Sequence, residues 1–386
     1  MNFIVSKRLS LIPPYLFVEI DRAKQKAKEE GKDIIDLGVG DPDLPTPNHI
    51  IEKLCEAVKD PKTHKYSLDQ GLLEFRQAIS GWYKKRFNVN LDPNKEIHPL
   101  IGSKEGISHL PLAVLDRGDY AVIPDPCYPV YRSGVILAEG IPYPLALLRE
   151  NAFLPDLKEI PLKIKKKTKL MFLNYPNNPT TAVATKEFFR KIVDFAFKYN
   201  VIVAHDAAYS EITFDGYKAE SFLETEGAKE IGIEFHSLSK TYNMTGWRIG
   251  WVCGSSEIIS ALAKVKSNID SGIFTAIQIA GVSALEGSQE HLEKMCRLYQ
   301  ERRDILVEGL NSLGWNVTKP KATFYLWVKI PKGDDSLKFS TYLLEKTDIV
   351  ITPGIGFGRY GEGYIRFALT VDKERIREAI ERLRKI

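Results

Sequence analysis

Short apolar runs alternate with amphipathic stretches through much of the chain, and this alternation restricts the fold more than any other feature. The runs KLMFLN (residues 169–174) and VIVAHD (residues 201–206) are almost wholly apolar until they end in polar residues, and the amphipathic stretch KEFFRKIVDFAFKYN lies between them. A strand that is apolar on both faces must be covered on both faces, and a helix is the usual connection between parallel strands. The sequence therefore predicts an α/β fold with a mostly parallel sheet sandwiched by helices.

The pattern changes near residue 285. Beyond it, a long charged stretch at 287–312 predicts one helix, and a second helix is predicted by KERIREAIERLRKI at the end of the chain. Between them, strands are predicted by the segments WNVTKP, TFYLWVKI, DIVITPG and YIRFALT. A chain of 386 residues is long enough for two or three domains of about 150 residues each. We expect an N-terminal arm (residues 1–45) that joins a smaller domain, a large α/β domain (46–285) and a small α+β domain (286–386).

Composition excludes several classes of function. The 54 basic residues nearly balance the 50 acidic ones, so the charge gives no reason to expect a nucleic-acid partner. The four cysteines are far apart and form no CxxC pair, which argues against a zinc site or a disulfide framework. No apolar run approaches about 18 residues, so we expect no membrane-spanning helix. The N-terminus is a poor signal peptide, and we expect a cytoplasmic protein without a metal site.

A lysine among hydroxyl groups is the first candidate for chemistry. The segment HSLSK ends in Lys240, and Arg248 follows eight residues later. A partly buried lysine near an arginine has a lowered pKa and can form a Schiff base. The hydroxyls of Ser237 and Ser239, together with the guanidinium of Arg248, suit a phosphate dianion. Taken alone, the same segment could equally be a strand end with a solvated lysine.

Two further segments place polar side chains just after predicted strands. HDAAY carries Asp206 and Tyr209, and YPNNP puts Asn178 on a proline-containing turn. At the carboxyl ends of parallel strands, such side chains face the crevice where ligands bind. A carboxylate there could keep a pyridine nitrogen protonated, and a phenol could donate to a ring oxygen. Taken separately, Asp206 could equally cap a helix, and the Asn-Pro segment could be an ordinary turn.

Glycine-rich segments give one candidate anion site and one false lead. GSKEG (residues 102–106) lies between a predicted strand and a predicted helix, so its backbone N–H groups could bind an anion, although it lacks the spacing of a P-loop. The segment GFGRYG (residues 356–361) fits the pattern GxGxxG. A strand rather than a helix is predicted after it, so it cannot bind a dinucleotide by the usual mechanism.

Together and in this order, these segments resemble the class I/II aminotransferases of fold type I, which depend on pyridoxal phosphate. The likeness covers essentially the whole chain. It is most specific to the LL-diaminopimelate aminotransferases in IPPYLFVEIDR, DLGVGDPDLPTP, PDPCYPVY, LNYPNNPT and FHSLSKTYNMTGWRIGW. It implies a seven-stranded type of sheet, pyridoxal 5'-phosphate as cofactor, and transfer of an amino group from LL-2,6-diaminopimelate to 2-oxoglutarate. The products would be tetrahydrodipicolinate and glutamate, in lysine biosynthesis.

The resemblance also implies a role for each matching residue. Lys240 would form the Schiff base and move a proton, Asp206 would pair with the ring nitrogen, and Tyr209 and Asn178 would bind the ring oxygen. Tyr128 would stack on the ring. The cofactor phosphate would be held by Ser103, Lys104, Ser237, Ser239 and Arg248. Tyr66 would reach the phosphate bound to the partner subunit, so a homodimer is implied. Substrates would be bound by Tyr15, Gly40, Lys104, Tyr128, Asn178 and Arg366.

Two positions depart from the family pattern, which has glycine where this chain has Thr181 and Cys127. Both flank residues expected to contact the cofactor, and neither removes a catalytic group. The choice of substrate stays open. An aspartate, alanine or aromatic aminotransferase would share the fold, and a pyridoxal-phosphate-dependent β-lyase or a catalytically silent binding module would share the cofactor site.

Overall fold

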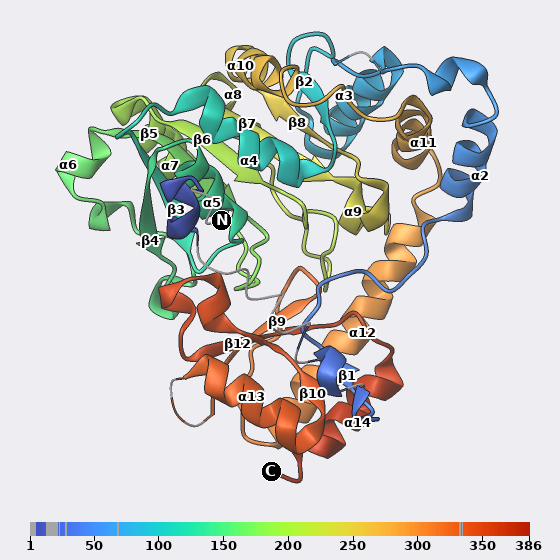
Figure 1. Cartoon of the computed structure of the whole chain (residues 1–386), viewed down its shortest axis with the longest axis vertical. Coiled ribbons are helices and arrows are strands. Elements are labelled where there is room, and N and C mark those ends of the chain that lie inside the picture. The colour runs from blue at the N-terminus through green and yellow to red at the C-terminus, as the bar shows by residue number, and fades with distance from the viewer. Residues whose placement is uncertain are drawn as a thin grey trace.

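The computed structural model describes residues 5–12, 22, 24–27, 29–67, 69–331, 333 and 335–386. It consists of a large α/β body and a smaller body beneath it, which are bridged by the long helix α12 (Glu290–Ser312) (Figure 1). No helix in these ranges is long and apolar enough to cross a membrane.

The large body is built on a seven-stranded sheet with the strand order β2-β8-β7-β6-β5-β3-β4. The strands are β2 (Ile97–Leu100), β3 (Tyr120–Asp125), β4 (Ile141–Ala146), β5 (Thr168–Asn174), β6 (Ile202–Asp206), β7 (Gly232–Ser237) and β8 (Gly250–Gly254). Strands β3 to β7 pair in parallel, and β8 alone runs against both of its neighbours. The predicted mostly parallel sheet is therefore confirmed.

Helices cover both faces of this sheet, and β5 shows why its sequence is apolar at nearly every position. Leu170 and Phe172 pack into one hydrophobic core, whereas Met171 and Leu173 pack into another on the opposite face. The first core is covered by α4 (Ser103–Val114), α5 (Val130–Leu137) and α10 (Ser256–Lys266). The second is covered by α3 (Leu73–Phe87), α7 (Lys186–Tyr199) and α11 (Thr275–Glu286). The remaining helices of the body are α2 (Asn48–Ala57), α6 (Leu162–Lys165), α8 (Ala228–Ile231) and α9 (Leu238–Thr241).

The small body has its own core and two short sheets. Strands β9 (Tyr325–Lys329), β11 (Thr352–Pro353) and β12 (Tyr364–Ala368) form an antiparallel sheet, and β1 (Ile35–Asp36) pairs in parallel with β10 (Ile349–Val350). The helices α13 (Ser336–Thr347) and α14 (Lys373–Leu383) pack with α12 on this core. Because β1 pairs with β10, residues 35–36 lie in the small body, whereas the 3₁₀ turn Lys7–Leu11 lies against α5 of the large body, where Arg8 donates to the carbonyl of Leu137 at 3.1 Å.

Two local predictions differ from the structure. WNVTKP forms no strand, because the side chain of Asn311 bonds both the N–H and the carbonyl of Val317, at 2.6 and 3.0 Å, and so takes groups that a strand neighbour would need. DIVITPG is divided into β10 and β11, which pair with different strands. The amphipathic stretch FVEIDRAKQKAKEE at residues 17–30 also predicts a helix, and it lies mostly outside the described residues; residues 22, 24–27 and 29 are helical.

Candidate active site

A cavity of about 260 Å³ lies where the carboxyl ends of the sheet strands meet the small body. It is lined by Gly40, Ser103, Lys104, Tyr128, Asn174, Asn178, Asp206, Ala208, Tyr209, Ser237, Ser239, Lys240, Thr245, Arg248, Tyr325 and Arg366. This set contains every site residue predicted from the sequence except two. Tyr15 lies outside the described residues, and Tyr66 is 93% exposed on a different groove.

Lys240 carries an amine that is suited to nucleophilic chemistry. The residue belongs to α9, directly after β7, and its Nζ donates to the carbonyl of Gly40 at 3.0 Å. Burial lowers the pKa of Lys240 to about 8; Asp41 opposes this shift, and Arg366 and Arg248 strengthen it. A substantial fraction of the amine is therefore unprotonated near neutral pH.

One end of the cavity is rich in donors for an anion. Gly102, with a φ of +74°, precedes α4, and a Cβ on it would lie 2.4 Å from Nη2 of Arg248. The absence of that Cβ lets the guanidinium of Arg248 lie beside the N-terminus of α4, where free N–H groups favour negative charge. The hydroxyls of Ser103, Ser237 and Ser239 line the same cavity.

Asp206 lies at the end of β6 and is 6% exposed. Its Oδ2 accepts a hydrogen bond from the hydroxyl of Tyr131 at 2.7 Å, and its Oδ1 accepts one from the N–H of Ala208 at 3.3 Å. Burial raises the pKa of Asp206, and the hydrogen bond from Tyr131 opposes that rise. The carboxylate is thus held in place, and a cation beside it would be bound strongly.

The turn after β5 is tied to two other walls of the cavity. Asn174 donates from Nδ2 to the carbonyl of Asp206 at 2.7 Å and accepts the N–H of Asn178 at 2.8 Å. The Oδ1 of Asn178 accepts from Nη1 of Arg366 at 2.8 Å. The turn continues to Thr181, whose φ of +62° explains why a glycine suits this position.

Arg366 points from β12 into the cavity and is 2% exposed. Its Nη2 donates to the carbonyl of Gly38 at 2.8 Å, and its guanidinium lies 4.1 Å from the ring centre of Tyr325. The hydroxyl of Tyr325 is in turn 3.1 Å from that of Tyr209. A planar, fixed guanidinium of this kind suits a carboxylate ligand.

The GxGxxG segment is a docking loop between the two bodies. Residues 354–361 form two short 3₁₀ turns, and the N–H of Tyr360 donates to Oδ1 of Asp125 at 3.0 Å. The N–H of Cys127 donates to the carbonyl of Phe357 at 2.8 Å. A Cβ on Gly358 would lie 2.2 Å from Oδ1 of Asp125, so this glycine is required for the contact. The loop therefore joins the small body to the strand end that precedes Tyr128.

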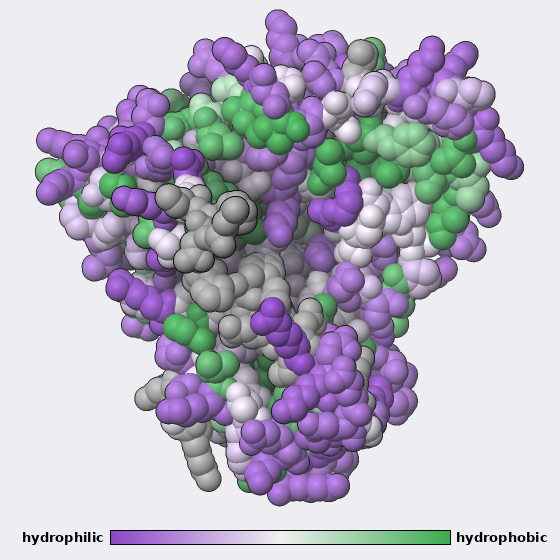
Figure 2. Space-filling model, in the orientation of Figure 1, coloured by the Kyte–Doolittle hydropathy of each residue, from purple (hydrophilic) through white to green (hydrophobic). Residues whose placement is uncertain are grey.

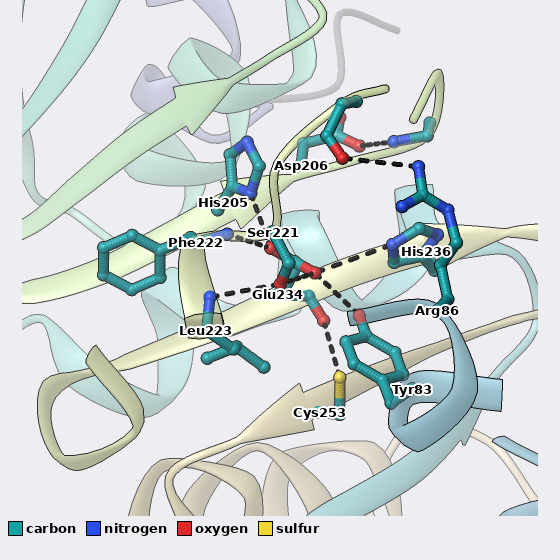
Figure 3. A network of polar contacts seen from close by, with 12 residues as sticks. Tyr83, Arg86, His205, Asp206, Ser221, Phe222, Leu223, Glu234, His236 and Cys253 are labelled. Carbon is teal, nitrogen blue, oxygen red and sulfur yellow. Dashed lines mark hydrogen bonds and ion pairs between the residues drawn. The ribbon is translucent and has the colours of Figure 1, made fainter. Parts of the chain in front are cut away.

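A buried carboxylate holds the strands behind the cavity together (Figure 3). Glu234, on β7, is fully buried and accepts hydrogen bonds from Tyr83, Ser221, His205 and the N–H of Phe222, at 2.8 to 2.9 Å. Burial raises its pKa, but the hydrogen bond from His205 and the imidazole of His236, whose Nε2 lies 3.6 Å from Oε1, outweigh burial, and the net shift is downward. Since Nε2 of His205 accepts the N–H of Tyr175 at 3.2 Å, the proton of His205 lies on Nδ1. Both histidines thus pack within the sheet.

Within the described ranges, one group could offer a metal ion three ligand atoms. Glu105, His109 and Asp270 bring such atoms within 4.8 Å of one another. The buried ammonium of Lys266 already contacts both carboxylates, with Glu105 at 3.2 Å. This lysine supplies the positive charge that a metal ion would bring.

Sequence reasoning missed several residues of the site. Asn174, Ala208, Thr245 and Tyr325 line the cavity, and Tyr131 supports Asp206 from behind. Two of these had a signal in the sequence. Asn174 ends β5 opposite Asp206 on β6, as parallel neighbours do. Tyr131 follows Tyr128 at a spacing of three and lies in the first turn of α5, just after Tyr128. Tyr325 and Thr245 had no such signal.

Comparison with known proteins agrees with this geometry. The family model described as aminotransferase class I and II matches residues 32–383. The chain is 56% identical to the LL-diaminopimelate aminotransferase of Moorella thermoacetica, over 99% of this chain and 98% of that protein. It is 57% identical to the enzyme of the same name from Halothermothrix orenii, over 98% and 97%. A substrate-bound structure of BacF from Bacillus subtilis superposes with a TM-score of 0.96 at 40% identity, covering 100% of this chain and 98% of that one.

The matches extend over nearly the whole chain, and they confirm the resemblance seen in the sequence motifs. They also agree with the mostly parallel sheet, the buried lysine and the buried arginine in one cavity. The chain therefore belongs to the class I and II aminotransferase family.

Proposed function

We propose that this aminotransferase uses pyridoxal 5'-phosphate and moves the amino group of LL-2,6-diaminopimelate to 2-oxoglutarate, giving tetrahydrodipicolinate and glutamate in lysine biosynthesis. The observation that carries the proposal is a single cavity holding a lysine amine, a buried carboxylate, an anion site and a fixed arginine. The choice of substrate rests on the names of the relatives that are 56% and 57% identical. An enzyme of this pathway would work in the cytoplasm, and that location remains a prediction.

The donor set of the cavity fits the cofactor at both ends. The phosphate would be held by Ser103, Lys104, Ser237, Ser239 and Arg248, beside the N-terminus of α4. The absent Cβ of Gly102 leaves room for the guanidinium at that position. At the other end, the buried Asp206 would pair with the protonated ring nitrogen, which would oppose the rise of its pKa caused by burial. Tyr128, Tyr209 and Asn178 line the space between the two ends.

Each catalytic group has a distinct task. Pyridoxal phosphate, when bound, supplies an aldehyde that condenses with amines and a ring that withdraws electrons from the reacting carbon. Lys240 holds the cofactor and then accepts and returns the substrate proton at Nζ, a task for which its lowered pKa of about 8 suits it. Asp206 keeps its charge through the hydrogen bond from Tyr131. Tyr209, whose hydroxyl contacts that of Tyr325, would donate to the ring oxygen.

Arg366 would bind the carboxylate next to the reacting carbon of both substrates. Its Nη1 and Nη2 are held by Asn178 and by the carbonyl of Gly38. Because both half-reactions share one cavity, the amino acid and the 2-oxo acid would use the same guanidinium. Position 40 requires a glycine, because a Cβ there would clash with the hydroxyl of Tyr325, the residue whose ring lies against the guanidinium of Arg366.

A homodimer completes the proposal. Tyr66 is 93% exposed, and the residue after it is anchored, since the buried Gln278 donates to Oγ of Ser67 at 2.8 Å and accepts the N–H of Leu72 at 2.7 Å. Apolar residues also gather over the side of the large body that carries α2 and α11 (Figure 2), where Ile51, Val58, Leu73 and Phe274 are exposed. A second copy on this side would bring Tyr66 to the other active site.

The test is a half-reaction with the purified holoenzyme and a panel of amino donors. Transfer of the amino group converts the absorbance of the bound cofactor to that of its amino form. We expect LL-2,6-diaminopimelate to react with the highest kcat/KM, and we expect no release of ammonia or pyruvate. A faster reaction with aspartate, alanine or phenylalanine would overturn the substrate, and a borohydride adduct on a lysine other than Lys240 would overturn the site.

A further inference from the structure

A second cavity, of about 330 Å³, lies at the free edge of the seven-stranded sheet. It is lined by Gln70, Arg76, Asn94, Lys95, Ile97, His98, Ser256, Ile259, Ser260 and Ala263. We call it the edge cavity; it lies where β2, α3 and α10 meet at the top of the large body (Figure 1). It shares no lining residue with the active site, and its lining contains cations, an imidazole and hydroxyls but no carboxylate.

Arg76, on α3, is a buried cation with spare donors. It is 7% exposed, and its Nη1 donates to the carbonyl of Pro93 at 2.5 Å and to Oδ1 of Asn94 at 3.3 Å. Its buried Nε has no hydrogen-bond partner in the part of the chain that the structure describes. Burial lowers the pKa of Arg76, although Glu74 and Asp92 oppose that shift from further away. A buried guanidinium with an unmatched donor is costly unless an anion satisfies it.

His98, on β2, is the second buried polar group of the edge cavity. It is 3% exposed, and its Nε2 also has no hydrogen-bond partner among the described residues. Its pKa is lowered to about 4, chiefly by burial and then by Lys266 and Arg76, while Asp270 opposes the shift. Since Lys266 is already paired with Glu105 and Asp270, Arg76 is the cation beside His98 whose buried donor is unmatched. Arg76 and His98, both more than nine-tenths buried, thus each present an unmatched nitrogen.

The mouth of the edge cavity adds further donors. Lys95 is exposed there, and Ser256 and Ser260 lie one turn apart at the start of α10. No side chain caps the N-terminus of this helix, so its first N–H groups remain donors and carry partial positive charge.

We propose that the edge cavity binds a small oxyanion, of the phosphate or carboxylate class, between Arg76, His98, Lys95 and the first turn of α10. The proposed oxyanion site stands whichever amino donor the enzyme uses, because the edge cavity shares no lining residue with the active site. The oxyanion would satisfy the buried nitrogens and offset the positive charge around them. Among the described residues no carboxylate lines the cavity to do the same.

The test is calorimetric titration of the holoenzyme, saturated with pyridoxal phosphate so that the phosphate donors of the active site are occupied. Inorganic phosphate is the first probe and acetate the second, both at constant ionic strength set with chloride. We expect one phosphate per chain, and an affinity about tenfold lower in Lys95→Glu, since a carboxylate at the mouth repels the anion. The control is Lys163→Glu, the same change of charge on an exposed residue of α6, which should leave the affinity unchanged.

An independent readout is the imidazole of His98, followed by NMR as the pH is lowered. A bound oxyanion favours the imidazolium, so the pKa of His98 should rise from about 4 when phosphate is added. Saturable binding of acetate in place of phosphate, weakened by Lys95→Glu, would keep the site and assign it to carboxylates, because acetate bound at Arg366 would not respond to a change at Lys95. Absence of saturable binding by either probe, or equal weakening by Lys95→Glu and Lys163→Glu, would overturn the proposal.

Discussion

Tyr131→Phe removes a single hydroxyl, and we expect it to change the acid side of the pH–activity profile. That hydroxyl donates to Oδ2 of Asp206 at 2.7 Å, and both side chains are buried. Without it, the carboxylate keeps only the longer hydrogen bond from the N–H of Ala208, at 3.3 Å. Burial already raises the pKa of Asp206, and the Tyr131 hydrogen bond is the largest effect that opposes it. The variant should therefore protonate Asp206 at a higher pH.

The size of the effect follows from the strength of the hydrogen bond. A hydrogen bond to a charged acceptor contributes about 1.5–3 kcal/mol. Since about 1.4 kcal/mol corresponds to one pKa unit, the acid limb of kcat/KM should move up by about one to two units. At a fixed pH on that limb, kcat/KM should fall about tenfold or more.

The matched control is Tyr83→Phe. Tyr83 is equally buried and donates a hydrogen bond of 2.8 Å to a buried carboxylate, that of Glu234, but it does not line the cavity. Both variants should lose about 1–3 kcal/mol of stability in urea titrations, whereas only Tyr131→Phe should shift the pH profile. A pH titration of the absorbance of the bound cofactor gives a second readout. An acid limb that stays within a few tenths of a unit of the wild type would refute the reasoning.

Three further outcomes follow from the structure. In the cofactor-free protein, Lys240 has a pKa of about 8 when folded and 10.5 when exposed, so the unfolded chain binds more protons between these two pH values. The free energy of unfolding should therefore rise with pH across that window, by up to about 3 kcal/mol. Urea titrations of Lys240→Ala should lack this rise. Gly358→Ala should lower the free energy of unfolding by about 2–4 kcal/mol and raise KM, because its Cβ would clash with Asp125. The control is Gly314→Ala, which also lies at positive φ but has open space around it, and which should cost about 1 kcal/mol. Equal unfolding midpoints of the two variants would contradict this. Thr181→Gly should stabilise the fold by about 0.5–1 kcal/mol, because relief of its positive φ exceeds the added chain entropy; a lower midpoint in thermal unfolding would count against it.

The fold was predictable wherever local pattern and tertiary environment agree. Strand β5 is apolar at successive positions because each face of the sheet has its own core, and that burial appears directly in the sequence. WNVTKP alternates apolar and polar residues, which is typical of a strand, but the side chain of Asn311 takes the backbone bonds of Val317. A side-chain contact from the preceding helix, six residues earlier, leaves no periodic signal in the segment it disrupts.

The candidate site was predictable to the extent that its residues end strands or begin helices. Asp206 and Lys240 stand directly after apolar runs, where topology alone brings them together. Tyr131 and Tyr325 were missed because their contribution depends on which atoms they meet across the fold, namely Oδ2 of Asp206 and the hydroxyl of Tyr209. The sequence neighbourhood of Tyr325 is indistinguishable from ordinary aromatic core, and the one signal for Tyr131 was its spacing of three from Tyr128.

The docking loop at 354–361 has a mechanical consequence for the active site. Phe357 packs 4.8 Å from the guanidinium of Arg366, and its carbonyl accepts the N–H of Cys127, the residue before Tyr128. Phe357 therefore links the guanidinium proposed to bind the substrate carboxylate to the strand end before Tyr128, the residue proposed to stack on the cofactor ring. We expect a displacement of Arg366 by a bound substrate to be felt at Tyr128 through this one residue.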